Sequence, residues 1–148
     1  MPRPAYDHRT REAPRPTPGV LLLSALFIGA GALHFVTPHP FDSIVPAWVP
    51  FPARTATLLS GAAEVLGGLG LLHPATRPAA RWGLLALLLA VFPANVNMAQ
   101  HPQQFGLPGW ALWARLPLQP LLMWAVWRAG RRGPSSAPPP HRAAARAD

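Results

Sequence analysis

Four apolar stretches, separated by short polar or proline-rich segments, dominate the chain. They cover residues 18–36, about 55–72, about 79–98 and about 110–127. Each is close to the ~20 residues that a helix needs to cross ~30 Å of hydrocarbon. The pattern therefore predicts an all-α fold, an integral membrane four-helix bundle over residues 18–127. A cleavable signal peptide is the competing interpretation of the first stretch, but the other stretches are equally apolar and its apolar run is too long.

The segments outside the four stretches differ in character. The two tails, residues 1–17 and 128–148, are rich in Pro, Arg and Ala without apolar periodicity, so we expect them to be disordered and at most to touch anionic lipid headgroups. The first loop, residues 37–53, mixes five prolines with aromatic and aliphatic residues, Phe41 and Trp48 among them. We expect this loop to form a structured cap on the outer face, with its aromatic side chains in the membrane interface.

The distribution of arginines predicts the orientation. The chain has a net charge of +8, and its 13 basic residues are all arginine. Eleven of them lie in the two tails and around the second loop, and the other two are Arg54 and Arg115. The positive-inside rule then places both termini in the cytoplasm and the protein in the cell membrane as a multi-pass chain. Because the arginines flank apolar spans, the lipid bilayer is the expected partner and nucleic acid is not.

The amino-acid inventory excludes several kinds of chemistry. The chain has no cysteine, which excludes disulfide scaffolds, thiolate zinc sites and iron–sulfur clusters. His34 is the only histidine well inside a span, and together with Glu64 it gives two good metal ligands where a catalytic metal normally has three. No nucleophile stands beside a base, and no phosphate-binding loop is present. We therefore expect no intrinsic cofactor, no metal and no catalytic residue, and a binding protein rather than an autonomous enzyme.

Polar residues inside the spans form the candidate site. Glu64 shares a helical face with small residues, Ser60, Gly61, Gly67 and Gly68, which allow a neighbouring helix to approach closely. At 1.5 Å per residue, Glu64 and Arg115 both lie roughly 12–13 Å below the outer boundary, so an ion pair between them is expected. The proposed ligand-binding residues in the outer half of the bundle are His34, Glu64, Asn95, Asn97, Arg115 and Gln119.

Three interpretations of these polar residues remain open. They could line a pocket for a ligand or redox cofactor, they could line a proton or solute path, or they could be a structural ion pair with interhelical hydrogen bonds. A pocket of several hundred Å³ that reaches the membrane plane would favour the first interpretation. A closed cluster with every polar atom paired would favour the structural one.

Four sequence segments resemble the DoxX family of small four-helix bacterial membrane proteins over about residues 31–127. They are GALHFVTPHPFDSIVPAWVP, LSGAAEVLGGLGLL, TRPAARWGLLALLLAVFPANVNM and LWARLPLQPLLMWAVW. The resemblance rests on the combination of H-F-x-x-P, S-G-x-x-E, F-P-A-N and R-L-P-L-Q. It implies a left-handed membrane bundle linked to quinone-coupled or thiol-related oxidoreductase systems, with membrane redox or stress-complex proteins as partners. All of the candidate residues except Asn97 fall on motif positions of that family.

The sequence and the resemblance together lead to one functional expectation. The chain would be an accessory component of a membrane redox system and would hold a small amphipathic ligand, such as a quinone, in an outer-half pocket. His34, Asn95 and Gln119 would bind its carbonyl oxygens, and Glu64 with Arg115 would tune their protonation. Without cysteine, a thiol relay is not the chain's own chemistry. The alternative is a non-catalytic membrane scaffold or assembly factor whose polar cluster is structural.

Overall fold

The computed structural model describes residues 15–106 and 108–131, and in these ranges the chain is all-α. The four long helices are α1 (Pro18–Val36), α3 (Ala53–Leu72), α4 (Arg77–Gln100) and α5 (Gly109–Ala129). Two short elements, α2 (His39–Asp42) and the 3-10 helix η1 (Pro102–Gln104), lie in the connections. The disorder expected for the tails concerns mainly residues 1–14 and 132–148, which lie outside the described residues.

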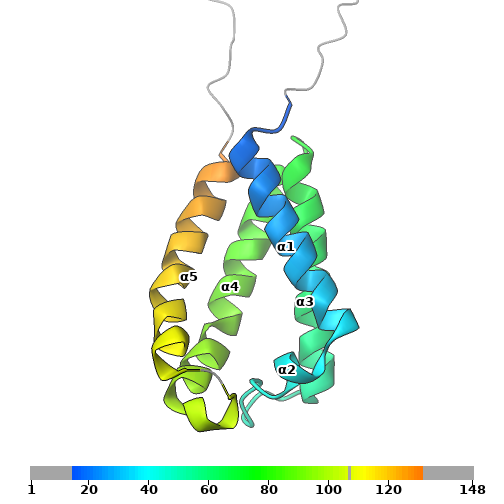
Figure 1. Cartoon of the computed structure of the whole chain (residues 1–148). Helices are drawn as coiled ribbons and strands as arrows, with labels where there is room; N and C mark the ends of the chain where they lie inside the picture. The colour runs from blue at the N-terminus through cyan, green and yellow to red at the C-terminus, as the bar shows by residue number, and fades with distance from the viewer. Residues whose placement is uncertain (1–14, 107, 132–148) are drawn as a thin grey trace, which may run out of the picture.

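The four long helices lie side by side, with their connections at two opposite ends (Figure 1). We call the end where α1 begins and α5 finishes the terminal end, and the opposite end, which carries α2 and η1, the loop end. Along the bundle α1 packs on α3, α3 on α4 and α4 on α5, whereas α1 and α5 touch over a short stretch.

Local sequence signals fix the helix ends. Proline stands in the first turn of both α1 and α4, where its missing N–H is no loss. The Thr17 hydroxyl accepts a hydrogen bond from the Val20 N–H at 3.4 Å and caps α1. At the C-terminal end of α3, the Arg77 guanidinium donates to the carbonyl oxygens of Leu71 (2.7 Å) and Leu72 (3.4 Å). These carbonyls have no partner inside the helix, so Arg77 satisfies the C-terminus of α3.

The stripe of small residues on α3 lets a neighbouring helix approach closely, as the sequence predicts, and in the structure this helix is α1. A Cβ atom at Gly61 would stand 2.6 Å from the Cβ of His34, and one at Gly31 would stand 2.6 Å from the Gly61 carbonyl oxygen. Gly68 likewise faces the backbone of Ser24 at 2.9 Å, whereas Gly67 faces α4 instead. This close crossing of α1 and α3 is what places His34 beside the face of α3 that carries Glu64.

Three of the long helices, α1, α3 and α4, are long and apolar enough to cross a membrane. Many of their leucines are exposed on the outside of the bundle, among them Leu22 at 72% and Leu66 at 69%, as expected for a membrane protein. The sequence predicts a fourth span at residues 110–127, and α5 does form there. However, Arg115, Gln119 and two internal prolines lower its mean hydropathy, and α5 is less apolar than the three helices that are candidate membrane spans.

Two apolar clusters hold the bundle together at different heights. The larger one lies toward the terminal end and consists of Val20, Phe27, Leu71, Leu84, Leu88 and Val126. The smaller one, at the loop end, joins α4 to α5 through Met98, Ala99 and Leu112. The side chains of the larger cluster therefore fill the bundle toward its terminal end, and the smaller cluster joins only α4 and α5 at the loop end.

The close crossing of α1 and α3 leads to a stability prediction. We expect Gly61→Ala to lower the free energy of unfolding in detergent by about 1–3 kcal/mol, because the new methyl group collides with the Cβ of His34. Gly83→Ala is the matched control, since a Cβ at Gly83 meets nothing within 4 Å and alanine favours the helix. Equal melting temperatures for both variants would mean that the two helices do not cross as closely as described.

Candidate functional site: a pocket at the loop end

A cavity of about 560 Å³ lies at the loop end, between the two apolar clusters. Side chains from all four long helices, from α2 and from the α2–α3 loop line it. Five of the six residues selected from the sequence are among them: His34, Glu64, Asn95, Arg115 and Gln119. Leu87, Leu88 and Leu122 also line the cavity and belong to or contact the larger apolar cluster, so the cavity ends where that cluster begins.

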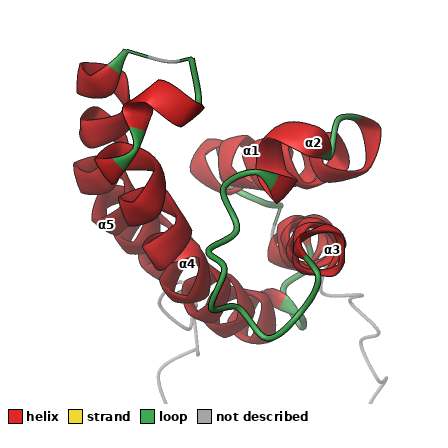
Figure 2. Ribbon diagram, turned by 90° about the horizontal axis from the view of Figure 1, so that it is seen from below, coloured by secondary structure: helices red, strands yellow, loops and turns green. Residues whose placement is uncertain are grey.

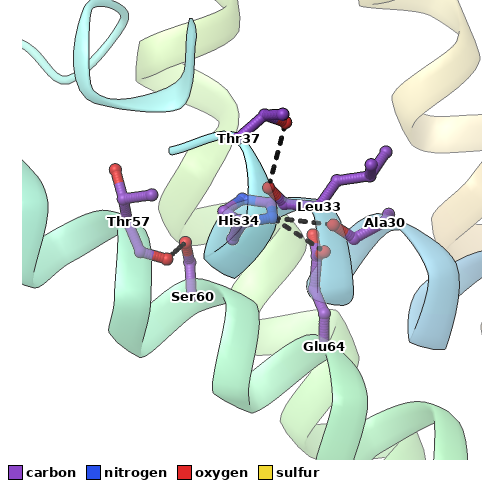
Figure 3. Close-up of polar contacts among 7 residues, drawn as sticks. All are labelled: Ala30, Leu33, His34, Thr37, Thr57, Ser60 and Glu64. Atoms are coloured by element: carbon purple, nitrogen blue, oxygen red, sulfur yellow. Dashed lines mark hydrogen bonds and ion pairs between the residues drawn. The ribbon is translucent and has the colours of Figure 1, made fainter. Parts of the chain in front are cut away.

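His34 and Glu64 form the polar group between α1 and α3 (Figure 3). The His34 Nδ1 donates to the Ala30 carbonyl oxygen at 2.9 Å and lies 3.7 Å from the Glu64 Oε2. The ring of Phe41, in α2, stacks on the imidazole ring of His34 with 3.8 Å between the ring centroids. His34 is only 8% exposed, so the ring is fixed by both contacts.

Asn95 and Gln119 form the polar group between α4 and α5. The Asn95 side-chain N–H donates to the Gln119 Oε1 at 2.7 Å, and the Gln119 Nε2 donates to the Leu88 carbonyl oxygen. Leu88 lies five residues before Pro93, and because Pro93 has no N–H, the neighbouring Leu89 carbonyl loses its backbone hydrogen bond in α4. Gln119 thus supplies an additional donor to the helical turns that this proline disturbs.

The expected ion pair between Glu64 and Arg115 is not formed. Within the described ranges, the ionisable side chain nearest the Glu64 carboxylate is His34, and the contact of the Arg115 guanidinium is with the Met98 sulfur at 3.9 Å. Depth along the helix axes places the two residues at one level, but it does not determine which way each side chain faces around its helix. Glu64 faces α1, while Arg115 is exposed at the edge of the cavity.

Asn97 does not line the cavity, and its backbone carbonyl oxygen accepts from the N–H and the Nδ1 of His101 at the end of α4. Two residues apart on a helix point about 200° away from each other, so Asn95 and Asn97 do not share one face.

Two polar residues that the sequence analysis left out of the site also line the cavity. Thr57 and Ser60 stand seven and four residues before Glu64 and share its helical face; the sequence placed Ser60 there as a small residue, and the same spacing would have added Thr57. The Ser60 hydroxyl donates to the Thr57 carbonyl oxygen at 2.9 Å. The Thr57 hydroxyl is buried without a hydrogen-bond partner, and so is the Glu64 Oε2. Two buried polar atoms beside the cavity are therefore left unsatisfied.

The α2–α3 loop covers the cavity, as the sequence predicts for the proline-rich cap. Seen from the loop end, the loop runs across the space between the α1–α3 side and the α4–α5 side (Figure 2). An ion pair between Asp42 and Arg54, 2.9 Å apart, ties the end of α2 to the start of α3 and closes the loop between them. Trp48 lines the cavity from this loop, yet it is 69% exposed, so part of its ring is also available to lipid or solvent.

The contact between His34 and Glu64 predicts thermodynamic coupling. We expect Glu64→Gln and His34→Gln each to lower the melting temperature in detergent, and the double variant to lose less than the sum, with a coupling of about 1 kcal/mol. The pair Glu64→Gln and Arg115→Gln serves as the matched cycle and should be additive within about 0.5 kcal/mol. If Glu64 were coupled to Arg115 and not to His34, the two residues would form an ion pair, which would contradict the contacts described above.

Comparison with known proteins gives one match. Residues 23–129 match a family described as a domain of unknown function (DUF8561). The match covers most of the chain, including nearly all of the four long helices, and the chain therefore belongs to this family. No curated protein and no solved structure matches the chain.

The match to DUF8561 shows that the assignment to the DoxX family is wrong. The quoted motifs are short, and each combines proline, glycine or aliphatic residues with one polar residue. Physical demands common to small membrane bundles produce such motifs, because prolines begin or bend helices and glycines allow close packing. With that assignment, the implied link to oxidoreductase systems loses its support.

Proposed function

Starting from this family of unknown function, we propose that the protein binds a small amphipathic ligand, such as a quinone, in the loop-end cavity. The observation that carries the proposal is the composition of the cavity. It is lined by five polar residues of the predicted site and by many apolar ones, among them Ile44, Val91 and Leu118. Its volume of about 560 Å³ falls in the usual range for sites of small ligands.

The cavity fits the ligand interpretation better than the scaffold interpretation. A purely structural cluster should pair all of its buried polar atoms, because each unpaired one costs about 1–3 kcal/mol. Here the Glu64 Oε2, which is 3.7 Å from the His34 Nδ1, and the Thr57 hydroxyl are buried without hydrogen-bond partners beside the cavity. The Thr57 hydroxyl can donate to a quinone carbonyl, and the Glu64 Oε2 can accept from the hydroxyl of the reduced quinol, which would remove this cost. The scaffold alternative is favoured only by the Asn95–Gln119 hydrogen bond, which is complete without a ligand.

The contacts of each side chain suggest how the ligand is held. The side-chain oxygen and nitrogen of Gln119 both form hydrogen bonds within the protein. We therefore assign Gln119 to positioning Asn95 and not to binding the ligand directly. Asn95 keeps a second N–H and its oxygen for the ligand, and Arg115 supplies guanidinium donors at the edge of the cavity. The Ser60 hydroxyl donates to a backbone carbonyl and not to a base, which supports binding rather than catalysis.

We extend the proposal to the orientation in the membrane. All four long helices would cross the bilayer, with the termini in the cytoplasm and the loop-end cavity in the outer half, because the arginines gather near the terminal end. In α5, Arg115 lies one to two turns from the loop end, from where its long side chain reaches toward the interface. Alkaline phosphatase fused after Gly106 should be active, and the same enzyme fused after Ala75 should be inactive. The reverse pattern would place the cavity on the cytoplasmic side.

A thermal-shift measurement tests the proposed ligand class. The full chain in a mild detergent should gain melting temperature when a quinone with a ten-carbon tail is added, because a ligand that binds only the folded state stabilises it. The matched control is the ten-carbon alcohol at the same concentration, which has the tail without the quinone ring. Equal stabilisation by both compounds, or by neither, would contradict recognition of the head by the polar residues.

A further inference from the structure

A second group of charged side chains lies at the terminal end, where α4 begins and α5 finishes. It consists of four arginines: Arg77, Arg81, Arg128 and Arg131. The described ranges contain two carboxylates, and neither lies here. Asp42 pairs with Arg54 at the loop end, and Glu64 faces His34. The positive charge of this group is therefore not balanced by a carboxylate of the described chain.

Arg81 is held in a fixed position within this group. Its guanidinium lies over the ring of Trp127 at 4.5 Å and over that of Trp82 at 5.1 Å, and the two rings meet edge to face at 5.3 Å. The stem of Arg81 lies against Gly130, where an added Cβ would stand 2.5 Å from the Cβ of Arg81. Its Nε is buried without a hydrogen-bond partner. The aliphatic part of Arg81 is thus packed against Gly130 and its guanidinium against the two rings, while the buried Nε has no hydrogen-bond partner among the described residues.

A hollow of about 350 Å³ adjoins this guanidinium. Its lining consists of Pro78, Arg81, Gly130 and Arg131, so two of its four lining residues are arginines from different helix ends. Arg77, by contrast, is already used to satisfy the C-terminus of α3. Arg131 is exposed, and Arg81 is partly buried, so one charge is fixed and the other can adjust to what enters.

We propose that this hollow binds the phosphate of an anionic phospholipid headgroup. The planar guanidinium matches the geometry of phosphate oxygens and forms two hydrogen bonds to them. Tryptophans beside a spanning helix lie at the level of the headgroups, and Trp82 and Trp127 place Arg81 at that level. Basic pockets between helix ends are the typical sites for such headgroups. The site is separate from the loop-end cavity and does not depend on its ligand.

Fluorescence polarisation tests this site on the full chain in a neutral detergent. The probe is phosphatidylglycerol labelled on an acyl chain, with phosphatidylcholine labelled in the same way as the neutral comparison. We expect tighter binding of phosphatidylglycerol, and Arg81→Gln and Arg131→Gln each to weaken it about fivefold, which corresponds to the roughly 1 kcal/mol that one basic residue contributes. Arg81→Lys should fall between the original chain and Arg81→Gln, because it keeps the charge without the planar fork.

Arg15→Gln is the matched control, since it removes the same charge at the same end without lining the hollow. It should change the affinity by less than twofold, and a loss as large as that of Arg81→Gln would show only diffuse attraction and overturn the proposal. Arg131 is exposed, so its variant keeps the test valid if Arg81→Gln does not fold. Displacement of the probe by glycerol phosphate at the same concentration as by unlabelled phosphatidylglycerol would show a soluble phosphate site and overturn the assignment to lipid.

Discussion

Gln119→Leu is expected to lower the free energy of unfolding in detergent by about 1–3 kcal/mol. Gln119 is 6% exposed and bridges Asn95 to the Leu88 carbonyl oxygen, so its replacement removes two hydrogen bonds at once. The amide of Asn95 is then left without its partner at the face between α4 and α5, and the desolvation cost of such a group is of this size. Thermal unfolding followed by circular dichroism measures the loss.

Two further variants define the cause of that loss. Gln100→Leu is the control, because Gln100 is exposed at the end of α4 and should tolerate the change. Asn95→Leu combined with Gln119→Leu should recover part of the stability, since both polar partners are then replaced by apolar groups. A neutral effect of Gln119→Leu alone would show that this bridge does not hold α4 and α5 together.

Ala94→Trp is expected to abolish most of the stabilisation by the ten-carbon quinone. Ala94 lines the cavity on α4, and a tryptophan there would occupy space that the ligand needs. Overpacking a formed site costs about 1–3 kcal/mol, so we expect the affinity to fall tenfold or more. The quinone titration of the melting temperature measures this change.

Ala86→Trp is the matched control for this prediction. Ala86 lies on the same helix, is exposed and does not line the cavity, so the quinone should still stabilise that variant as it does the original chain. If Ala94→Trp and Ala86→Trp respond to the quinone alike, the ligand binds elsewhere on the protein.

The helices were predictable from the sequence because length and apolarity determine them. The segments expected at residues 18–36 and 55–72 appear as α1 and α3 with almost the same boundaries. The stripe of small residues predicted that a neighbouring helix would approach α3 closely, and the structure identifies that helix as α1. The fourth stretch forms a helix, α5, but its polar residues and prolines offset its apolar ones, and it is not among the candidate membrane spans.

The sequence predicted the level along the bundle at which the polar residues gather, but it did not predict which side chains contact each other. Counting residues along each helix brought His34, Glu64, Asn95, Arg115 and Gln119 to one cavity. It did not give the rotation of each helix about its axis, and this rotation decides that Glu64 meets His34 rather than Arg115. The stacking of Phe41 on His34 was out of reach for the same kind of reason, because a proline-rich loop has no period from which its side-chain directions follow.

The lining of the loop-end cavity is part polar and part apolar, and for this reason we propose that an amphipathic ligand occupies it in the membrane. Native mass spectrometry of the full chain, purified in a mild detergent from its membrane, tests this claim most directly. We predict a bound amphipathic molecule at one per chain in the original protein and in Ala86→Trp, and its absence in Ala94→Trp. The claim would be contradicted if the purified original protein carried no such molecule, or if the Ala94→Trp variant carried the same molecule.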